Sequence, residues 1–232
     1  MTLRRIAIAD CLQGELADYC YNRISSYVRP DFEPFRLRAM DDPIPDDPES
    51  WSIENNVAAL VVAGSLHSPL DPEPWILELG NFTADFFSGG RPLLAICFGH
   101  ELIARALGGK LEKKSSLTVE FKDIRILTDD PLFHGLEKTS RMPVAHEVMV
   151  ASVPPDFDVI GSTDDCPVQA MRHSTKPVYG VQFHPEMDAG IRSFDPNWRV
   201  LSEASLEKSE GPVVMKNFIG IVRQLAEQQK AE

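Results

Sequence analysis

The stretch "LLAICFGHE", residues 93–101, decides how the chain folds around it. Four apolar residues lead without a break to Cys97, and after Gly99 the pattern changes at once to the spacing of an amphipathic helix. The apolar side of that helix is formed by Leu102, Ile103, Ala106 and Leu107. The stretch therefore predicts a buried strand that stops on a cysteine and turns sharply into a helix.

A cysteine in such a turn has two explanations. In the first, Cys97 is a nucleophile held at the carboxyl edge of a sheet, where the positive end of the following helix favours the thiolate. The backbone N–H of Phe98 points to the same place and can stabilise an oxyanion, and Gly99 fits a turn with little room for a side chain. In the second, Cys97 is a core residue, because free cysteine is often buried. This stretch alone leaves both open.

The first half of the chain alternates between strand-like and helix-like segments. Strands are predicted over 4–10, 32–40, 57–64 and 91–97, and helices over 14–28, 73–90 and 99–109. Such alternation predicts an α/β fold with helices on both faces of a parallel sheet. The acidic, proline-rich segment 41–50 is interpreted as a solvated loop.

The pattern changes after residue 110. Strand-like runs separated by turns follow over 121–130, 142–150, 157–165, 166–174 and 177–187, and an amphipathic helix is predicted over 211–229. The basic stretch "EKKSS", 112–116, is interpreted as a solvated turn. Because neither an internal repeat nor a second domain boundary is visible, a single domain over 1–232 is predicted.

Composition excludes several classes of protein. The 232 residues suit one domain, and 43% hydrophobic residues allow a large core. A net charge of -12 disfavours nucleic-acid binding, and no apolar run approaches the roughly 18 residues of a membrane span. The four cysteines form no CxxC pair and no apolar leader precedes the first strand, so a reduced, cytoplasmic setting is expected.

A second motif, "VYGVQFHPEM" at 178–187, supplies partners for a cysteine nucleophile. An apolar strand runs into His184, which can act as the base that takes the thiol proton and returns it to the leaving group. Glu186 lies on the same side of an extended segment as His184, two residues away, and can therefore orient the imidazole. The histidine motif alone is a weak signal, but paired with the strand-end cysteine it is a strong one.

Together these motifs resemble the two signatures of the class I glutamine amidotransferases, a family with a Cys-His-Glu triad. Three further stretches are similar to the family and lie in the same order along the chain, at 60–71, 129–136 and 143–157. The resemblance covers roughly residues 4–187 and includes the glutaminase domain of GMP synthase and stand-alone proteins similar to γ-glutamyl peptidases. It implies a flavodoxin-like, mainly parallel sheet with flanking helices and an added antiparallel portion.

The resemblance also implies roles for individual residues. Cys97 attacks the side-chain amide of glutamine and forms a γ-glutamyl thioester, His184 protonates the departing ammonia and then activates water, and Glu186 orients His184. The backbone N–H groups of Gly64 and Phe98 form the oxyanion hole. No metal ion or organic cofactor is expected, because a thiol and a histidine suffice for this acyl transfer.

The substrate-binding positions are less regular. Glu101 stands where the family usually has glutamine, and the resemblance places it at the α-amino end of the substrate, where a carboxylate can pair with an ammonium group. In the glycine loop, Ser65 and Leu66 replace a glycine and a proline of many members, and Ser65 is expected to contact substrate. His146 either faces the active site or caps a strand.

Three functions remain open on the sequence. The first is a glutaminase whose ammonia passes to a synthase on a separate polypeptide, because no acceptor domain and no P-loop motif is found. The second is a free-standing hydrolase of γ-glutamyl peptides or conjugates, which needs the same triad. The third is a non-catalytic regulatory module, against which all three triad residues argue.

Overall fold

The fold is built on one continuous sheet of nine strands, seen in a computed structural model that describes residues 4–231, with 229–231 described by their backbone alone. Five parallel strands run in the order β2-β1-β3-β4-β9. Their bounds are β1 (Arg5–Asp10), β2 (Glu33–Arg38), β3 (Val57–Val62), β4 (Leu93–Ile96) and β9 (Val178–Val181). All residues of β3, β4 and β9 are buried, as expected of parallel strands covered on both faces.

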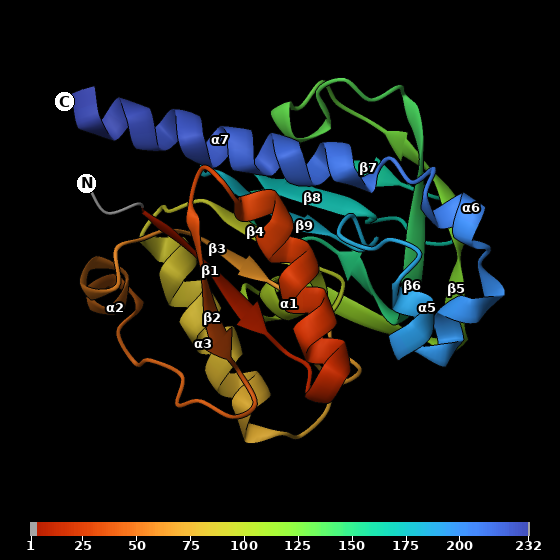
Figure 1. Cartoon of the computed structure of the whole chain (residues 1–232), viewed down its shortest axis with the longest axis horizontal. Helices are drawn as coiled ribbons and strands as arrows, with labels where there is room; N and C mark the ends of the chain where they lie inside the picture. Colours follow the sequence, from red (N-terminus) through yellow and green to blue (C-terminus); the bar gives the residue numbers. More distant parts are fainter. Residues whose placement is uncertain (1–3, 232) are drawn as a thin grey trace.

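Helices cover both faces of the parallel half (Figure 1). Side chains of α1 (Gly14–Val28) and α7 (Gly211–Ala231) join one core, in which Ile6 and Ile8 represent β1. The opposite core contains Ala7 and Ala9 with side chains of α2 (Pro48–Glu54), α3 (Pro74–Ser88) and α4 (Phe98–Ala106). Successive β1 residues thus enter opposite layers, which is the period of two expected of a strand.

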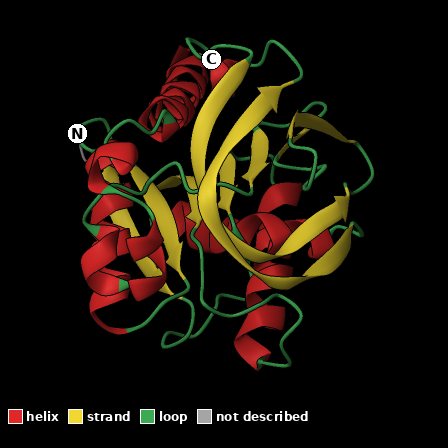
Figure 2. Ribbon diagram, turned by 90° about the vertical axis from the view of Figure 1, so that its right-hand side faces the viewer, coloured by secondary structure: helices red, strands yellow, loops and turns green. Residues whose placement is uncertain are grey.

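The other half of the sheet is antiparallel and continues from β9 in the order β8-β7-β5-β6. Its strands are β5 (Lys110–Ile126), β6 (Thr139–Ser152), β7 (Phe157–Ser162) and β8 (Ala170–His173). Figure 2 shows the two long strands curling away from the parallel half. Short helical segments complete the chain: η1 (Pro131–Phe133), α5 (Ile191–Phe194), η2 (Pro196–Val200) and α6 (Glu203–Leu206).

The predicted fold class is confirmed, with two local corrections. Segment 41–50 is not loop throughout, because α2 begins at Pro48, where Asp47 accepts hydrogen bonds from the backbone N–H groups of Glu49 and Ser50. The stretch 112–116 is not a turn but part of β5. Its pairing with β6 is nevertheless irregular there, since the register shifts between Lys113 and Thr118.

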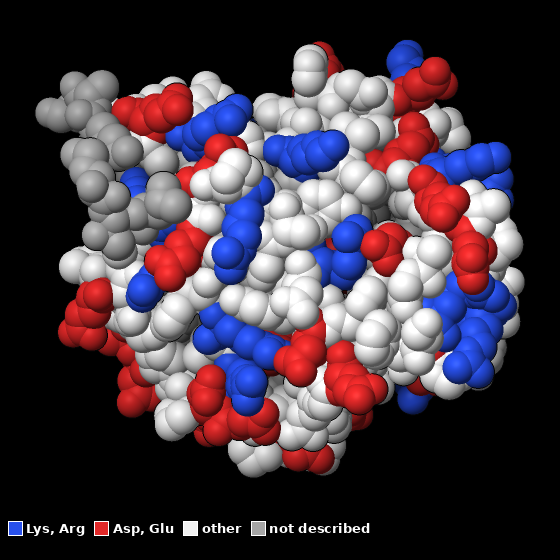
Figure 3. All heavy atoms as spheres, viewed as in Figure 1, with Lys and Arg blue, Asp and Glu red and all other residues white. Residues whose placement is uncertain are grey.

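Figure 3 shows how charged side chains are distributed over one face of the molecule. On the face shown in Figure 3, acidic and basic side chains are interspersed and no continuous basic stripe crosses the molecule. Between residues 4 and 231, no helix combines the length and the apolar character that crossing a membrane requires.

Candidate active site

Cys97 lies directly between β4 and α4 and has an unusual backbone. Its φ is 50° and its ψ is -104°, a backbone conformation that residues other than glycine rarely adopt. The backbone N–H of Cys97 donates to the carbonyl of Val181 at 2.8 Å, which ties the turn to β9. Such strain is retained where a turn must present a side chain, so the predicted sharp strand-to-helix turn is confirmed.

Two glycines allow other groups to approach this turn closely. A Cβ on Gly99 would lie 2.5 Å from the carbonyl oxygen of Val62 and 2.9 Å from its Cβ, so only glycine lets α4 start so close to β3. A Cβ on Gly64 would lie 3.0 Å from Cε1 of His184 and 3.8 Å from Cβ of Cys97. The backbone of Gly64 therefore borders both side chains, which is consistent with the oxyanion-hole role expected for it.

Strand order brings the histidine motif to the cysteine. Ile96 of β4 lies opposite Val181 of β9 in a parallel pair, so the segments that follow both residues leave the sheet at the same edge. Nδ1 of His184 lies 2.9 Å from Oε1 of Glu186, and the imidazole also interacts with Cys97, whose thiol donates to the carbonyl of Ala145 at 3.5 Å. The three predicted triad residues are thus connected in the order Cys97, His184, Glu186.

The segment that carries the histidine is held from two sides. Arg23 of α1 donates to the carbonyl of Glu186 at 3.2 Å. A Cβ on Gly211, at the start of α7, would lie 2.6 Å from both Cα and the carbonyl oxygen of Pro185, so the helix contacts this backbone directly. Trp198 packs its ring edge-on against the imidazole of His184 with 5.2 Å between centroids. These contacts fix the position of the His184 ring.

Burial and nearby charges act in opposite directions on the pKa values of Cys97 and His184. Burial raises the pKa of the Cys97 thiol, and His184 only partly opposes it. Burial disfavours protonation of His184, yet the sulfur of Cys97 and the carboxylate of Glu186 outweigh it and raise the pKa of the imidazole well above its ordinary value. Burial therefore opposes the thiolate that the helix N-terminus favours.

Cys97 and His184 lie in the wall of a cleft of about 290 Å³. All the predicted site residues line it: Gly64, Ser65, Cys97, Phe98, Glu101, His146, His184 and Glu186. Glu101 is 4% exposed and accepts a 2.8 Å hydrogen bond from the amide of Gln182, whose nitrogen lies 3.9 Å from Sγ of Cys97. Burial raises the pKa of Glu101 to about 8, against the opposing effects of Gln182 and His184.

Ser65 and His146 line the cleft and also form hydrogen bonds with backbone groups. The Ser65 hydroxyl donates to the carbonyl of Cys11 at 2.7 Å and accepts from the N–H of His67, so it organises the glycine loop as well as lining the cleft. His146 is buried and its Nδ1 lies 2.8 Å from the carbonyl of Val148, so it bonds to its own strand and borders the cleft at once. Contact of either residue with substrate remains a prediction.

Two residues of the site were missed from the sequence. Gln182 had a signal, because it precedes His184 by two residues and therefore shares the side of the chain that carries His184 and Glu186. Trp198 had none, because its packing on His184 depends on the short helices after Met187, whose path no sequence pattern indicated. Among residues 4–231, no group of three or more His, Cys, Asp or Glu side chains is arranged to hold a metal ion.

A strained cysteine elbow, a histidine and an orienting glutamate define the site of a cysteine-nucleophile enzyme on a flavodoxin-like sheet. The family profile described as "Glutamine amidotransferase class-I" matches residues 26–195, and the chain belongs to this family. The family predicted from the two motifs is therefore confirmed.

Individual relatives show which members of the family the chain is similar to. The glutamine-hydrolyzing subunit of GMP synthase from Pyrococcus abyssi is 42% identical over 96 residues, which cover 41% of this chain and 51% of that protein. The GMP synthase of a Parafrankia species is 35% identical over 65% of this chain, and the match spans 27% of its length. A solved Thermoplasma acidophilum structure, proposed to be the corresponding GMP synthase subunit, has a TM-score of 0.74 at 22% identity over 99% of each chain, a likeness of fold. The chain thus matches about half or less of each of these two curated relatives.

Proposed function

We propose that the chain hydrolyses the side-chain amide of glutamine to glutamate and ammonia. The observation that carries the proposal is the connected Cys97–His184–Glu186 arrangement in the wall of the cleft. It supplies a nucleophile, a base within reach of it and a carboxylate that orients the base, which is what acyl transfer from an amide requires.

In the first half-reaction, Sγ of Cys97 attacks the amide carbon while His184 takes the thiol proton. The oxyanion faces the backbone of Gly64 and the N-terminus of α4 at Phe98, where N–H groups lack partners within the helix. His184 then gives its proton to the amide nitrogen, the C–N bond breaks, and ammonia leaves a γ-glutamyl thioester on Cys97.

In the second half-reaction, His184 takes a proton from water, and the resulting hydroxide attacks the thioester carbon. The C–S bond breaks, the sulfur recovers a proton from His184, and glutamate leaves. Glu186 remains ionised throughout and stabilises the imidazolium that forms twice in each turnover. The raised pKa of His184 suits this part, because a strong base takes the proton of a buried thiol more readily.

The proposal has two forms, which differ in the leaving group and in what becomes of its nitrogen. Relatives named as GMP synthase subunits favour ammonia transfer to a synthase on another chain. The alternative, hydrolysis of γ-glutamyl peptides or conjugates, uses the same residues with a larger leaving group. It is favoured by the open cleft mouth, where Leu66 is 72% and Leu117 is 48% exposed, so that an apolar leaving group has a surface to contact.

We expect the purified chain to release ammonia from glutamine and to form γ-glutamyl hydroxamate when hydroxylamine intercepts the thioester. The same assay with a γ-glutamyl dipeptide measures the alternative, and a preference of about tenfold or more in kcat/KM assigns the leaving group. If neither compound is cleaved and no acylated Cys97 is found by mass spectrometry, the proposed hydrolysis is wrong.

Glu101 offers a prediction about substrate recognition. We propose that its carboxylate pairs with the α-ammonium of the γ-glutamyl group, so Glu101→Ala should raise KM for an α-amino substrate about ten- to a hundredfold. The N-acylated analogue should be little affected. Since the pKa of Glu101 is about 8, binding an ammonium must expel its proton at lower pH, and KM should therefore fall as pH rises from about 6 to about 8.

The isosteric Glu101→Gln variant is the matched control, because it keeps the contact with Gln182 but cannot ionise. It should lose the pH dependence of KM that the wild type shows. A melting curve tests the alternative that Glu101 merely favours the start of α4, worth under about 1 kcal/mol. A lowered melting temperature with KM unchanged would remove Glu101 from the site.

A further inference from the structure

The irregular part of β5 places a lysine beside the cleft. Lys113 pairs with Val148 and Thr118 with His146, so four residues of β5 lie opposite the single residue Glu147 of β6. This bulge includes Lys114, whose side chain is only 15% exposed. A regular strand here would not leave four residues unpaired beside His146, so the bulge gives Lys114 its position.

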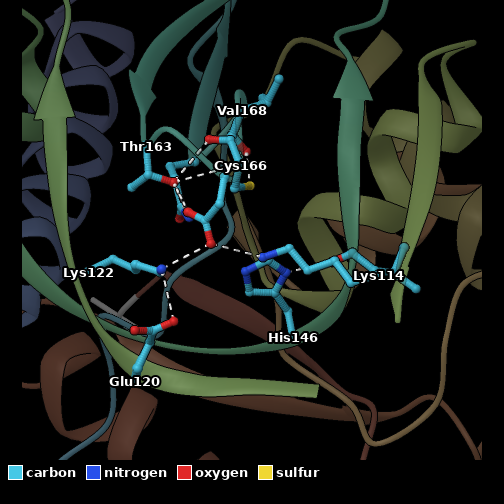
Figure 4. Close-up of polar contacts among 10 residues, drawn as sticks. Lys114, Glu120, Lys122, His146, Thr163, Cys166 and Val168 are labelled. Atoms are coloured by element: carbon cyan, nitrogen blue, oxygen red, sulfur yellow. Dashed lines mark hydrogen bonds and ion pairs between the residues drawn. The ribbon is translucent and has the colours of Figure 1, made fainter. Parts of the chain in front are cut away.

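The carboxylate of Asp165 anchors Lys114. Nζ of Lys114 lies 3.4 Å from Oδ2 of Asp165, in the turn between β7 and β8. The same oxygen lies 2.9 Å from Nζ of Lys122, and Oδ1 accepts from the hydroxyl of Thr163 at 2.9 Å. In Figure 4, Lys114 and Lys122 approach this carboxylate from opposite sides, and the ring of His146 lies beneath Lys114. His146, which borders the cleft, therefore lies next to this network.

The tautomer of His146 follows from its partner. Nδ1 lies 2.8 Å from the carbonyl of Val148, and a carbonyl can only accept, so Nδ1 must carry the hydrogen. In the neutral ring, Nε2 is then a bare acceptor, and it is buried without a partner in the described part of the chain. His146 is 3% exposed and borders the cleft, so this unpaired nitrogen lies buried beside the space that a substrate would occupy.

Burial, and after it the charges around the ring, decide whether Nε2 remains an unprotonated acceptor at low pH. Burial, the ammonium of Lys114 and the nearby His184 all disfavour a second proton, whereas the Val148 carbonyl and Asp165 favour it. His100 of α4 also interacts with the ring and is itself neutral, because burial lowers its pKa to about 3. The combined effect lowers the pKa of His146 to about 4.

We propose that Lys114, anchored by Asp165, is a positioning residue that adds to burial in keeping His146 neutral, so that Nε2 accepts a hydrogen bond from the γ-glutamyl substrate. This rests on the proposed function for the part that concerns substrate. The protonation of His146 does not, and it can be measured without turnover.

The decisive measurement is a ¹H–¹⁵N correlation spectrum of the histidine rings from about pH 3.5 to 8, with His146 assigned by its loss in His146→Gln. The wild type should show the Nδ1–H tautomer and titrate near pH 4. Lys114→Met should move that titration upward by about one pH unit and Lys114→Glu by about two, because a like charge nearby is removed and then reversed. Lys114→Arg should restore the wild-type value.

Lys122→Met is the matched control, because it removes the other lysine from the same carboxylate. It should leave the titration of His146 within about 0.3 pH units of the wild type. An unmoved titration in Lys114→Met and Lys114→Glu, or an equal shift in Lys122→Met, overturns the proposal.

Kinetics separate this inference from the proposed function. At about pH 5, KM of Lys114→Glu should exceed the wild-type value by about tenfold, and the difference should shrink toward pH 8 as His146 becomes neutral. A shifted titration with an unshifted KM would show that His146 does not contact substrate. A shifted titration in a chain without any hydrolase activity would contradict the proposed function alone.

Discussion

Cys97→Ser should lower kcat for amide hydrolysis by roughly 10⁴-fold or more, while the melting temperature stays within about 3 °C of the wild type. The hydroxyl replaces the thiol with little change of volume at a position that is 5% exposed. What it lacks is nucleophilicity, because His184 can take a proton from a thiol far more readily than from an alcohol. No γ-glutamyl adduct should be detected on the variant by mass spectrometry.

Cys166→Ala is the matched control for this prediction. Cys166 is fully buried, whereas Cys97 is 5% exposed; Cys166 lies outside the cleft lining, and burial raises the pKa of its thiol to about 12. The control should lose some stability and keep its kcat. Near-normal hydrolysis by Cys97→Ser, or an equal loss in Cys166→Ala, would show that Cys97 is not the nucleophile.

The parallel half of the fold could be predicted because its signals are local. Buried strands such as 57–62 are continuous apolar runs, and the helix that follows Cys97 has apolar residues at helical spacing. The cysteine and histidine motifs could be joined without knowing the topology, since each ends an apolar strand. What the motifs did not contain is the adjacency of β4 and β9, which brings Cys97 and His184 to one edge.

The parts that were missed depend on contacts between distant segments. Segment 112–116 is polar and charged, so its pattern indicates a turn, yet it belongs to β5 because β6 supplies backbone partners. The helical segments between 191 and 206 are each too short to show a period. They are held by packing around Trp198, a residue whose contact with His184 has no counterpart in the spacing of the chain.

The effect of burial on the pKa values of Cys97 and Glu101 could not be predicted, for a related reason. From the sequence, the start of a helix favours a thiolate at Cys97, and a carboxylate that pairs with an ammonium group is expected at Glu101. Both groups are buried, and burial raises both pKa values. Desolvation is set by everything packed around a group, so it cannot be read from the few residues on either side of it.

Among the triad residues, we expect substitutions of His184 and of Glu186 to differ most in how far they lower kcat. His184→Ala should lower kcat by roughly 10⁴- to 10⁶-fold, because it removes the base that moves the proton in both half-reactions. Glu186→Gln should lower it less, by roughly 10²- to 10⁴-fold, because the imidazole remains in place without its charged partner. Steady-state kinetics near neutral pH on both variants measures the order of these effects.

The pH profile of Glu186→Gln tests the role of the carboxylate more closely. Glu186 contributes to the raised pKa of His184, so removing its charge should lower that pKa and move the acid limb of kcat/KM toward lower pH. The amide also places an NH₂ group where Oε2 of Glu186 is buried without a partner among the described residues, which adds to the loss. Asp188→Asn, which removes a half-exposed acid paired with Arg23 two residues away, should leave the profile in place. An acid limb that does not move in Glu186→Gln, or a larger loss there than in His184→Ala, would contradict the orienting role of Glu186.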